Sequence, residues 1–265
     1  MQRYKITYNI SDVVPYINWI YFYHAWQVKD PDEQRELRQQ ADDRLMRLEG
    51  KYFTHALFAI GNANGDGDDI VFEDSIIPLL RQQKTTDDGE PNLCLADFLR
   101  PKEQGIADRL GIFATTVDIG LETDFTADDY ERMMMQLLAD RLAEATAEKM
   151  HLEVRKTYWG YAPDEQLTMS QLHSEKFQGI RPAVGYPSLP DASLNFVLDS
   201  ILHFGDIGIR LTESGAMKPH ASVSGLMISH LKSRYFSIGH IGDDQLKDYA
   251  MRRGIPLQLM KKFIS

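Results

Sequence analysis

Three carboxylates at four-residue spacing are the first side chains whose pattern could support chemistry. Asp140, Glu144 and Glu148 share one face of a predicted long helix, because residues four apart are neighbours on a helix surface. Taken alone they are typical of a solvated acidic stripe, and we interpret Glu148 as part of one. The eight histidines are scattered singly, with none at metal-ligand spacing from another, so structural histidines are the simpler interpretation.

The short motifs of common enzyme classes are absent from the sequence. It has no G-x-G-x-x-G turn, Walker loop, G-x-S-x-G elbow or H-E-x-x-H helix. Cys94 is the only cysteine, which excludes a disulfide framework and a thiolate zinc cluster. Composition and spacing therefore do not define a reaction.

Charge and hydropathy narrow the class of partner. The 29 basic and 39 acidic side chains give a net charge of −10, which argues against nucleic-acid binding. Residues 1–9 lack the layout of a signal peptide, and no apolar run approaches membrane-spanning length. We expect a cytoplasmic protein that binds neither nucleic acid nor membrane.

The elements that would position a site alternate without a regular βαβ order. Helices are predicted at 31–48, from a capping box at Thr126 and Asp129 to 156, and at 168–177, 193–204 and 243–253, with Asp30 and Thr168 as further caps. Strands are predicted at 55–60, 69–73, 110–121, 207–211, 221–229 and 235–241. The mixture favours the α+β class.

Three connecting segments have distinctive compositions. The aromatic run 13–26 must be buried or lie at an interface. The acidic stretch 61–68 resembles a calcium loop but lacks an EF-hand ligand pattern, so we favour a hairpin turn. Three prolines and a glycine make 181–190 a rigid loop.

Several motifs, in one order, give the sequence a family resemblance. They are INWIYFYHAW (17–26), GDDIVF (67–72), LLRQQ (79–83), NLCLADFLRPKEQGIAD (92–108), YERMMMQLLADRLAEATAEKMHLEVRKTYWGYAPDEQL (130–167), FQGIRPAVGYPSLPD (177–191), LTESGAMKPHASVSGLMISH (211–230) and SRYFSIGHI (233–241). Each resembles the matching stretch of the activation (S-adenosylmethionine-binding) domain of cobalamin-dependent methionine synthase, with RPAVGYP the most specific. The resemblance covers essentially residues 1–265 and implies one α+β domain, a bent, largely antiparallel sheet flanked by helices.

The function implied by the resemblance is repair. A domain of this family binds S-adenosylmethionine and supports the reductive methylation of inactive cob(II)alamin to methylcobalamin, with the electron supplied by a flavodoxin-like donor. The sequence has no cobalt-ligating D-x-H-x-x-G loop and no thiolate zinc site. We therefore expect a stand-alone subunit, inactive on homocysteine alone, whose partner is a cobalamin-binding methionine synthase without its own activation domain.

The resemblance assigns roles in the RPAVGYP loop. Arg181 matches an arginine that meets the ligand, where a guanidinium can fork onto the methionyl carboxylate. Ala183 lies in backbone that contacts the adenine side, and Gly185 marks a tight turn or a close approach to ligand. Tyr186, the candidate catalytic residue, matches a tyrosine facing the cobalamin; a packed loop aromatic is the alternative.

Other matched residues come from distant segments. Glu144 and Glu175 match acidic residues at the ligand site, while Tyr235 matches a ligand-contacting tyrosine with Phe236 beside it; a buried strand aromatic is the alternative for Tyr235. Asn18 stands where the family usually has an aspartate that meets the ligand's amino end. Asparagine keeps an acceptor but loses the charge, which weakens the bond.

Two other functions stay open on the sequence. A docking module that binds a corrinoid protein without S-adenosylmethionine would fit the loss of charge at Asn18. A reactivator of another corrinoid methyltransferase would fit the same motifs.

Overall fold

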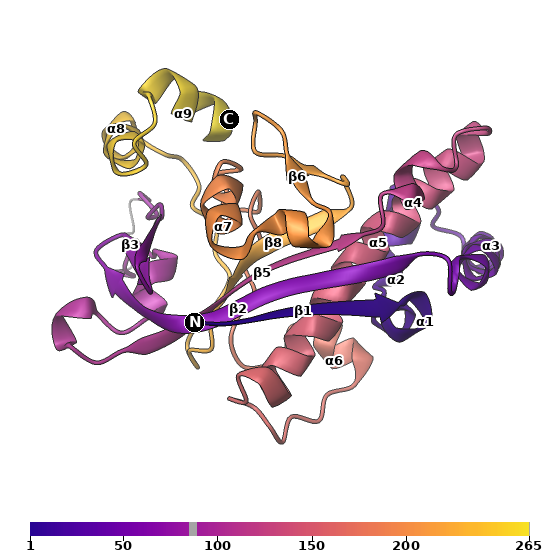
Figure 1. Ribbon diagram of the computed structural model, residues 1–265, viewed down its shortest axis with the longest axis horizontal. Coiled ribbons are helices and arrows are strands. Elements are labelled where there is room, and N and C mark those ends of the chain that lie inside the picture. Colours follow the sequence, from indigo (N-terminus) through magenta and orange to yellow (C-terminus); the bar gives the residue numbers. More distant parts are fainter. Residues whose placement is uncertain (85–88, 265) are drawn as a thin grey trace.

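The fold is built on one curled antiparallel sheet, seen along its length in Figure 1. A computed structural model describes residues 1–84 and 89–264. The sheet has the order β4-β3-β2-β5-β8, and β1 pairs with the first half of β2 on the edge whose second half pairs with β3. The strands are β1 (Gln2–Asn9), β2 (Phe53–Asp66), β3 (Asp69–Phe72), β4 (Ser75–Pro78), β5 (Asp108–Val117) and β8 (Ser222–Met227).

Both faces of the central strands are buried, which explains their nearly continuous apolar sequence. Along β2, Phe58 and Ile60 pack into one core, and Leu57 and Ala59 pack into another on the opposite face. Successive side chains of a strand point to opposite faces, so a single strand serves both cores. The predicted α+β class and the bent antiparallel sheet are confirmed.

Helices cover the two faces of the sheet unequally. The first core lies under α1 (Ile10–Val13), α2 (Trp19–Ala25), α3 (Pro31–Leu48) and the long α5 (Asp129–Glu153), which ends in a π-helical turn (Val154–Tyr158). The second core lies under α7 (Leu194–Leu202). Smaller elements are α4 (Gly120–Thr123), α6 (Met169–His173), and the hairpin of β6 (Arg210–Leu211) and β7 (Met217–Lys218).

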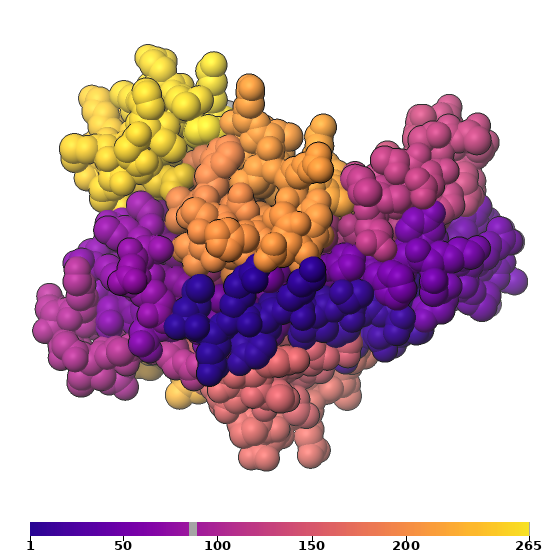
Figure 2. Space-filling view, in the orientation of Figure 1, coloured from indigo at the N-terminus to yellow at the C-terminus, as the bar shows by residue number. Residues whose placement is uncertain are grey.

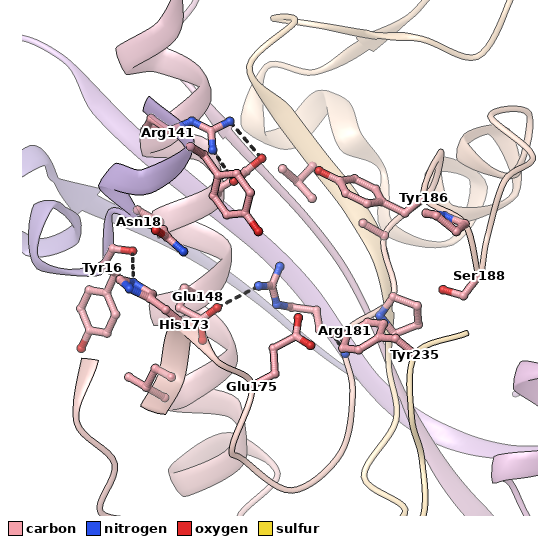
Figure 3. A pocket seen from close by; sticks show the side chains of 18 of the residues that line it. Tyr16, Asn18, Arg141, Glu148, His173, Glu175, Arg181, Tyr186, Ser188 and Tyr235 are labelled. Carbon is pink, nitrogen blue, oxygen red and sulfur yellow. Dashed lines mark hydrogen bonds and ion pairs between the residues drawn. The ribbon is translucent and has the colours of Figure 1, made fainter. Parts of the chain in front are cut away.

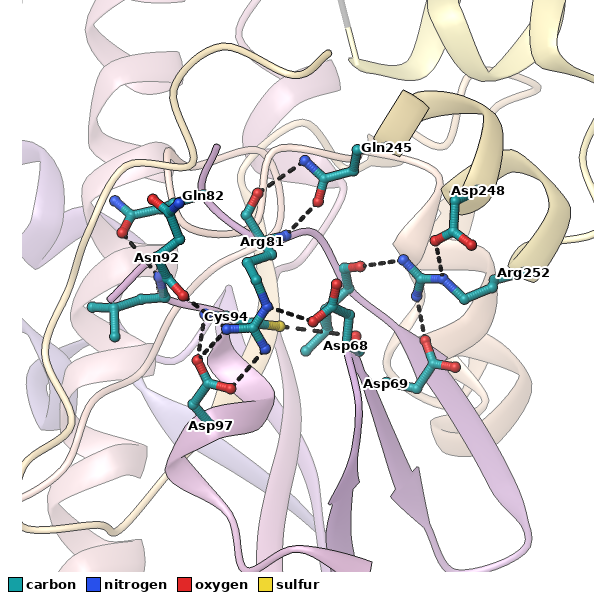
Figure 4. Close-up of polar contacts among 12 residues, drawn as sticks. Asp68, Asp69, Arg81, Gln82, Asn92, Cys94, Asp97, Gln245, Asp248 and Arg252 are labelled. Carbon is teal, nitrogen blue, oxygen red and sulfur yellow. Dashed lines mark hydrogen bonds and ion pairs between the residues drawn. The ribbon is translucent and has the colours of Figure 1, made fainter. Parts of the chain in front are cut away.

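A third, smaller core joins α8 (Asp243–Arg252) and α9 (Leu257–Ile264) to the rest. Figure 2 shows these yellow helices and the orange segment beside them as one raised mass above β1. The side-chain amide of Gln245 accepts a hydrogen bond from the backbone N–H of Arg81 and donates one to the backbone carbonyl of the same residue (Figure 4). The Arg81 guanidinium donates to the carboxylates of Asp68 and Asp97. Asp191, fully buried, accepts from the Tyr249 hydroxyl at 2.8 Å.

Several predicted elements need correction. The hairpin at 61–68 is confirmed, but β2 extends through most of it and ends at Asp66. It extends so far because β2 and β3 stay paired up to Asp66 and Asp69, and because the N–H of Asn62 donates to the Glu73 carboxylate. Helix α5 is capped by Asp128 and not by Thr126. Strand β1 was not predicted. The predicted strand 207–211 shrinks to two residues, since a 3-10 turn (Phe204–Ile207) precedes it.

The predicted strand at 235–241 is absent, and this segment is an extended loop. Its polar groups bond to loops, because Ile238 N–H donates to the Pro187 carbonyl and the Gln82 amide donates to the Ser237 carbonyl. Ile238 is its buried side chain, while Tyr235 is 38% exposed, so the apolar spacing resembles a strand in sequence without forming one.

The rigid loop 181–190 lies on the free edge of β8. Val184 N–H donates to the Ser224 carbonyl at 2.9 Å, and Leu226 N–H donates to the Pro182 carbonyl at 3.0 Å. This pairing covers backbone groups that an edge strand would otherwise expose. A Cβ at Gly225 would lie 2.1 Å from the Pro182 carbonyl oxygen, so only glycine permits the approach.

We predict that Gly225→Ala lowers the free energy of unfolding by about 3 kcal/mol, because the added methyl group separates the loop from the sheet. Gly205→Ala is the matched control, since a Cβ there meets nothing within 4 Å, and it should change stability by less than about 1 kcal/mol. Urea denaturation measures both. Equal stabilities would mean that the loop adjusts without cost.

Candidate functional site

A cavity of about 790 Å³ opens between α5, the segment around Asn18, the end of α6 and the loop 181–188 (Figure 3). Its size lies within the range of small-molecule sites. The sequence elements that meet here are far apart in the chain, and the cavity exists because α5 and the loop pack against neighbouring strands of one sheet.

Eight of the nine predicted site residues line this cavity: Asn18, Glu144, Glu175, Arg181, Ala183, Tyr186, Tyr235 and Phe236. Gly185 does not line it. Its φ of +89° and the bond from its N–H to the Leu189 carbonyl show that the residue makes a tight turn, a conformation that glycine adopts without strain.

Arg181 is held between the loop and α5. Its Nη2 lies 3.1 Å from the Glu148 carboxylate, and these side chains are 16% and 13% exposed. Its backbone N–H donates to the Tyr235 hydroxyl at 2.9 Å. The interpretation of Glu148 as part of a solvated stripe is therefore wrong, because the loop covers this part of the helix face.

The buried ion pair leaves one atom of each partner unused. Glu148 Oε1 and Arg181 Nε are both buried and have no hydrogen-bond partner. A buried polar group without a partner costs about 1–3 kcal/mol. The pair that lines the cavity thus has an unsatisfied acceptor on its carboxylate and an unsatisfied donor on its guanidinium, and this chemistry matches that of a zwitterionic ligand.

Glu175 faces Arg181 from the other side, as Figure 3 shows. Burial is the main cause that raises the pKa of Glu175; the negative charge of Glu148 adds to it, and the Arg181 guanidinium opposes it. The residue follows α6 in a left-handed conformation with φ of +55°, at a helix end where glycine is usual. Such strain clusters at functional sites.

Asn18 serves first as the N-cap of α2. Its Oδ1 accepts from Ile20 N–H at 3.3 Å, which satisfies one of the free donors at the start of that helix. The side chain therefore has its amide NH₂ group left for a ligand. At the cavity mouth Tyr186 is 53% exposed, and the aromatic run 13–26 contributes the exposed Tyr21.

A second buried charge network lies near the end of α5, beyond Glu148 along the helix. Arg155 and Glu165, with side chains 0% and 7% exposed, are joined at 2.7 Å, and Arg155 Nη1 lies 2.9 Å from His151 Nδ1. Burial, with the positive charges of Arg155 and Arg181, holds the pKa of His151 well below its usual value. Neutral His151 can thus accept from Arg155, and the network fixes α5 one turn after Glu148.

Sequence reasoning missed Glu148 and the cavity-lining Arg141, Tyr16 and His173. The spacing of Arg141 and Glu144, now seen paired at 2.9 Å, was an available signal. Within residues 1–84 and 89–264, no three His, Cys, Asp or Glu side chains are grouped so as to hold a metal ion. No helix in these ranges has the length and apolar character needed to cross a membrane.

Comparison with known proteins places this site in context. Residues 9–254 match the family model described as vitamin B12 dependent methionine synthase, activation domain. A crystal structure of the MetH reactivation domain bound to AdoHcy superposes with a TM-score of 0.94 at 36% sequence identity, covering 99% of this chain and 89% of that chain.

We predict that Glu165→Gln lowers the free energy of unfolding by about 3–5 kcal/mol, because it leaves the buried Arg155 without a counter-charge. Asp32→Asn, which breaks a pair whose side chains are 77% and 76% exposed, is the control and should cost at most about 1 kcal/mol. Denaturant titration compares them. A similar small effect of both would show that solvent reaches Arg155.

Proposed function

Because this chain belongs to the activation-domain family of vitamin B12-dependent methionine synthase, we propose that its 790 Å³ cavity binds S-adenosylmethionine. The observation that carries the proposal is the buried Glu148–Arg181 pair with its unused acceptor and donor. These groups complement the amino-acid end of such a ligand. The related crystal structure is bound to AdoHcy, a ligand with the same amino-acid end.

The charges of the cavity support a cationic ligand. The charged side chains that line it, with histidine neutral, are three carboxylates and two guanidiniums, which leaves one negative charge: Glu144, Glu148, Glu175, Arg141 and Arg181. S-adenosylmethionine carries an ammonium, a sulfonium and a carboxylate, so its net charge is one positive. Arg181 would hold the carboxylate, and the backbone at Ala183 with Tyr235 and Phe236 would border the adenine.

We further propose that the bound ligand presents its methyl group to cobalamin carried outside these 265 residues. One-electron reduction of cob(II)alamin by a flavodoxin-like donor would be uphill, and transfer of the sulfonium methyl group to the reduced cobalt, with release of S-adenosylhomocysteine, would draw it to methylcobalamin. The contribution of this chain is positioning. Tyr186, exposed at the cavity mouth, would face the corrin.

The proposed partner is a cobalamin-binding methionine synthase without its own activation domain. One cysteine cannot build a thiolate zinc site for homocysteine, and the sequence has no D-x-H-x-x-G loop for cobalt. Homocysteine methylation would therefore depend on groups outside these 265 residues. The contact would be transient, because the corrin must leave the chain to react elsewhere during turnover.

We predict that the protein binds S-adenosylmethionine without added metal and that Arg181→Ala weakens binding about 10- to 100-fold, as expected for a lost charge-assisted bond. Isothermal titration measures both. Arg47→Ala, an exposed arginine on α3, is the control and should bind as wild type. Absence of wild-type binding at millimolar ligand would favour a docking module. If Arg181→Ala binds as tightly as wild type, Arg181 does not hold the carboxylate of the ligand.

We predict that the chain restores a cobalamin-dependent synthase trapped as cob(II)alamin, only when S-adenosylmethionine and a reductant are present. Tyr186→Ala should slow this recovery while leaving ligand affinity within about twofold, since the side chain lies at the mouth. The decay of the cobalt(II) absorption band gives the rate. A rate that is independent of this chain would contradict reactivation even if the ligand binds.

A further inference from the structure

The two carboxylate oxygens of Glu148 have different surroundings, because only one of them has a hydrogen-bond partner within the protein. Oε2 lies 3.1 Å from Arg181 Nη2, while Oε1 is buried with no hydrogen-bond partner. The other buried side-chain atom without a partner at this cavity is Arg181 Nε, within the described residues. Both unused atoms belong to the same ion pair, one on the carboxylate and one on the guanidinium.

The neighbouring polar groups differ from Glu148 Oε1, because each is already partnered or open to solvent. Glu144 has both oxygens engaged by Arg141, at 2.9 and 3.2 Å, and its side chain is 38% exposed. Glu175 is an exposed residue, so water can satisfy its carboxylate when no ligand is bound. Asn18 is neutral, and its oxygen already accepts from Ile20 N–H at the start of α2, so a bond from an ammonium group would lack charge assistance there. Its remaining N–H groups offer nothing to an ammonium group, which has donors and no acceptor.

We infer that Glu148 is a specificity-determining residue that accepts a hydrogen bond from the α-ammonium group of the ligand through Oε1, while its Oε2 holds Arg181 for the α-carboxylate. This inference rests on the proposed function, and it identifies Glu148 as the side chain that recognises the α-ammonium group of the ligand. The pair recognises an α-amino acid as a unit, and both buried atoms gain partners in the bound state. Ligands without the ammonium group lose this contact even when they keep the adenosyl and sulfonium groups.

The test is a set of titrations of wild-type protein and Glu148→Gln with three ligands. These are S-adenosylmethionine, its decarboxylated form, and the analogue in which hydrogen replaces the α-amino group. The substituted amide would keep an oxygen near Arg181 but lose the charge, so Glu148→Gln should weaken the two ammonium-bearing ligands about 10- to 100-fold. The deaminated analogue should bind equally well to both proteins. Asp129→Asn, whose side chain is 90% exposed at the start of the same helix and does not line the cavity, is the control and should change all three affinities by less than about threefold.

The outcomes separate this inference from the proposed function. If wild-type protein does not bind S-adenosylmethionine, the proposed function fails. If it binds and Glu148→Gln binds equally well, only the inference fails. A loss confined to the two carboxylate-bearing ligands would mean that Glu148 acts solely through Arg181, which also overturns the inference. Should Glu148→Gln not fold in a thermal-unfolding assay, Glu148→Asp, which withdraws the oxygens by one methylene, must show the same ligand pattern.

Discussion

The ion pair between Glu148 and Arg181 is the contact on which the site depends. It joins the long helix α5 to the loop that pairs with the edge strand β8, across 33 residues of sequence. A buried pair is costly unless its remaining polar atoms are also satisfied. Here two of these atoms are left without partners, so the apo protein retains a free-energy cost that a complementary ligand can remove.

The rest of the fold keeps that pair in place. The loop is stiffened by prolines and bonded along β8, where Gly225 allows the backbones to approach closely. Behind α5, the buried Arg155–Glu165 pair and neutral His151 fix the helix beyond Glu148. The site is therefore preorganised on both sides, which reduces the ordering that binding would require.

Electrostatics and backbone strain point to the same place. Glu175 is held in a left-handed conformation beside Arg181, and its pKa is raised mainly by burial. The charged form of a carboxyl group in this position is stabilised when a cation lies close to it. The single excess negative charge of the cavity suits the sulfonium form of an adenosyl ligand better than a neutral thioether.

The sequence by itself determined the α+β class, the long helix, the rigid loop, and eight of the residues that line the cavity, because these depend on local periodicity, turn chemistry and family motifs. It did not determine the burial of Glu148, the loop at 235–241 or the capping role of Asn18. Glu148 has the same helical spacing as the more exposed Glu144, and only the packing of a distant loop makes their environments differ. Such long-range contacts leave no periodic signal in the sequence, so the tertiary structure alone decided them.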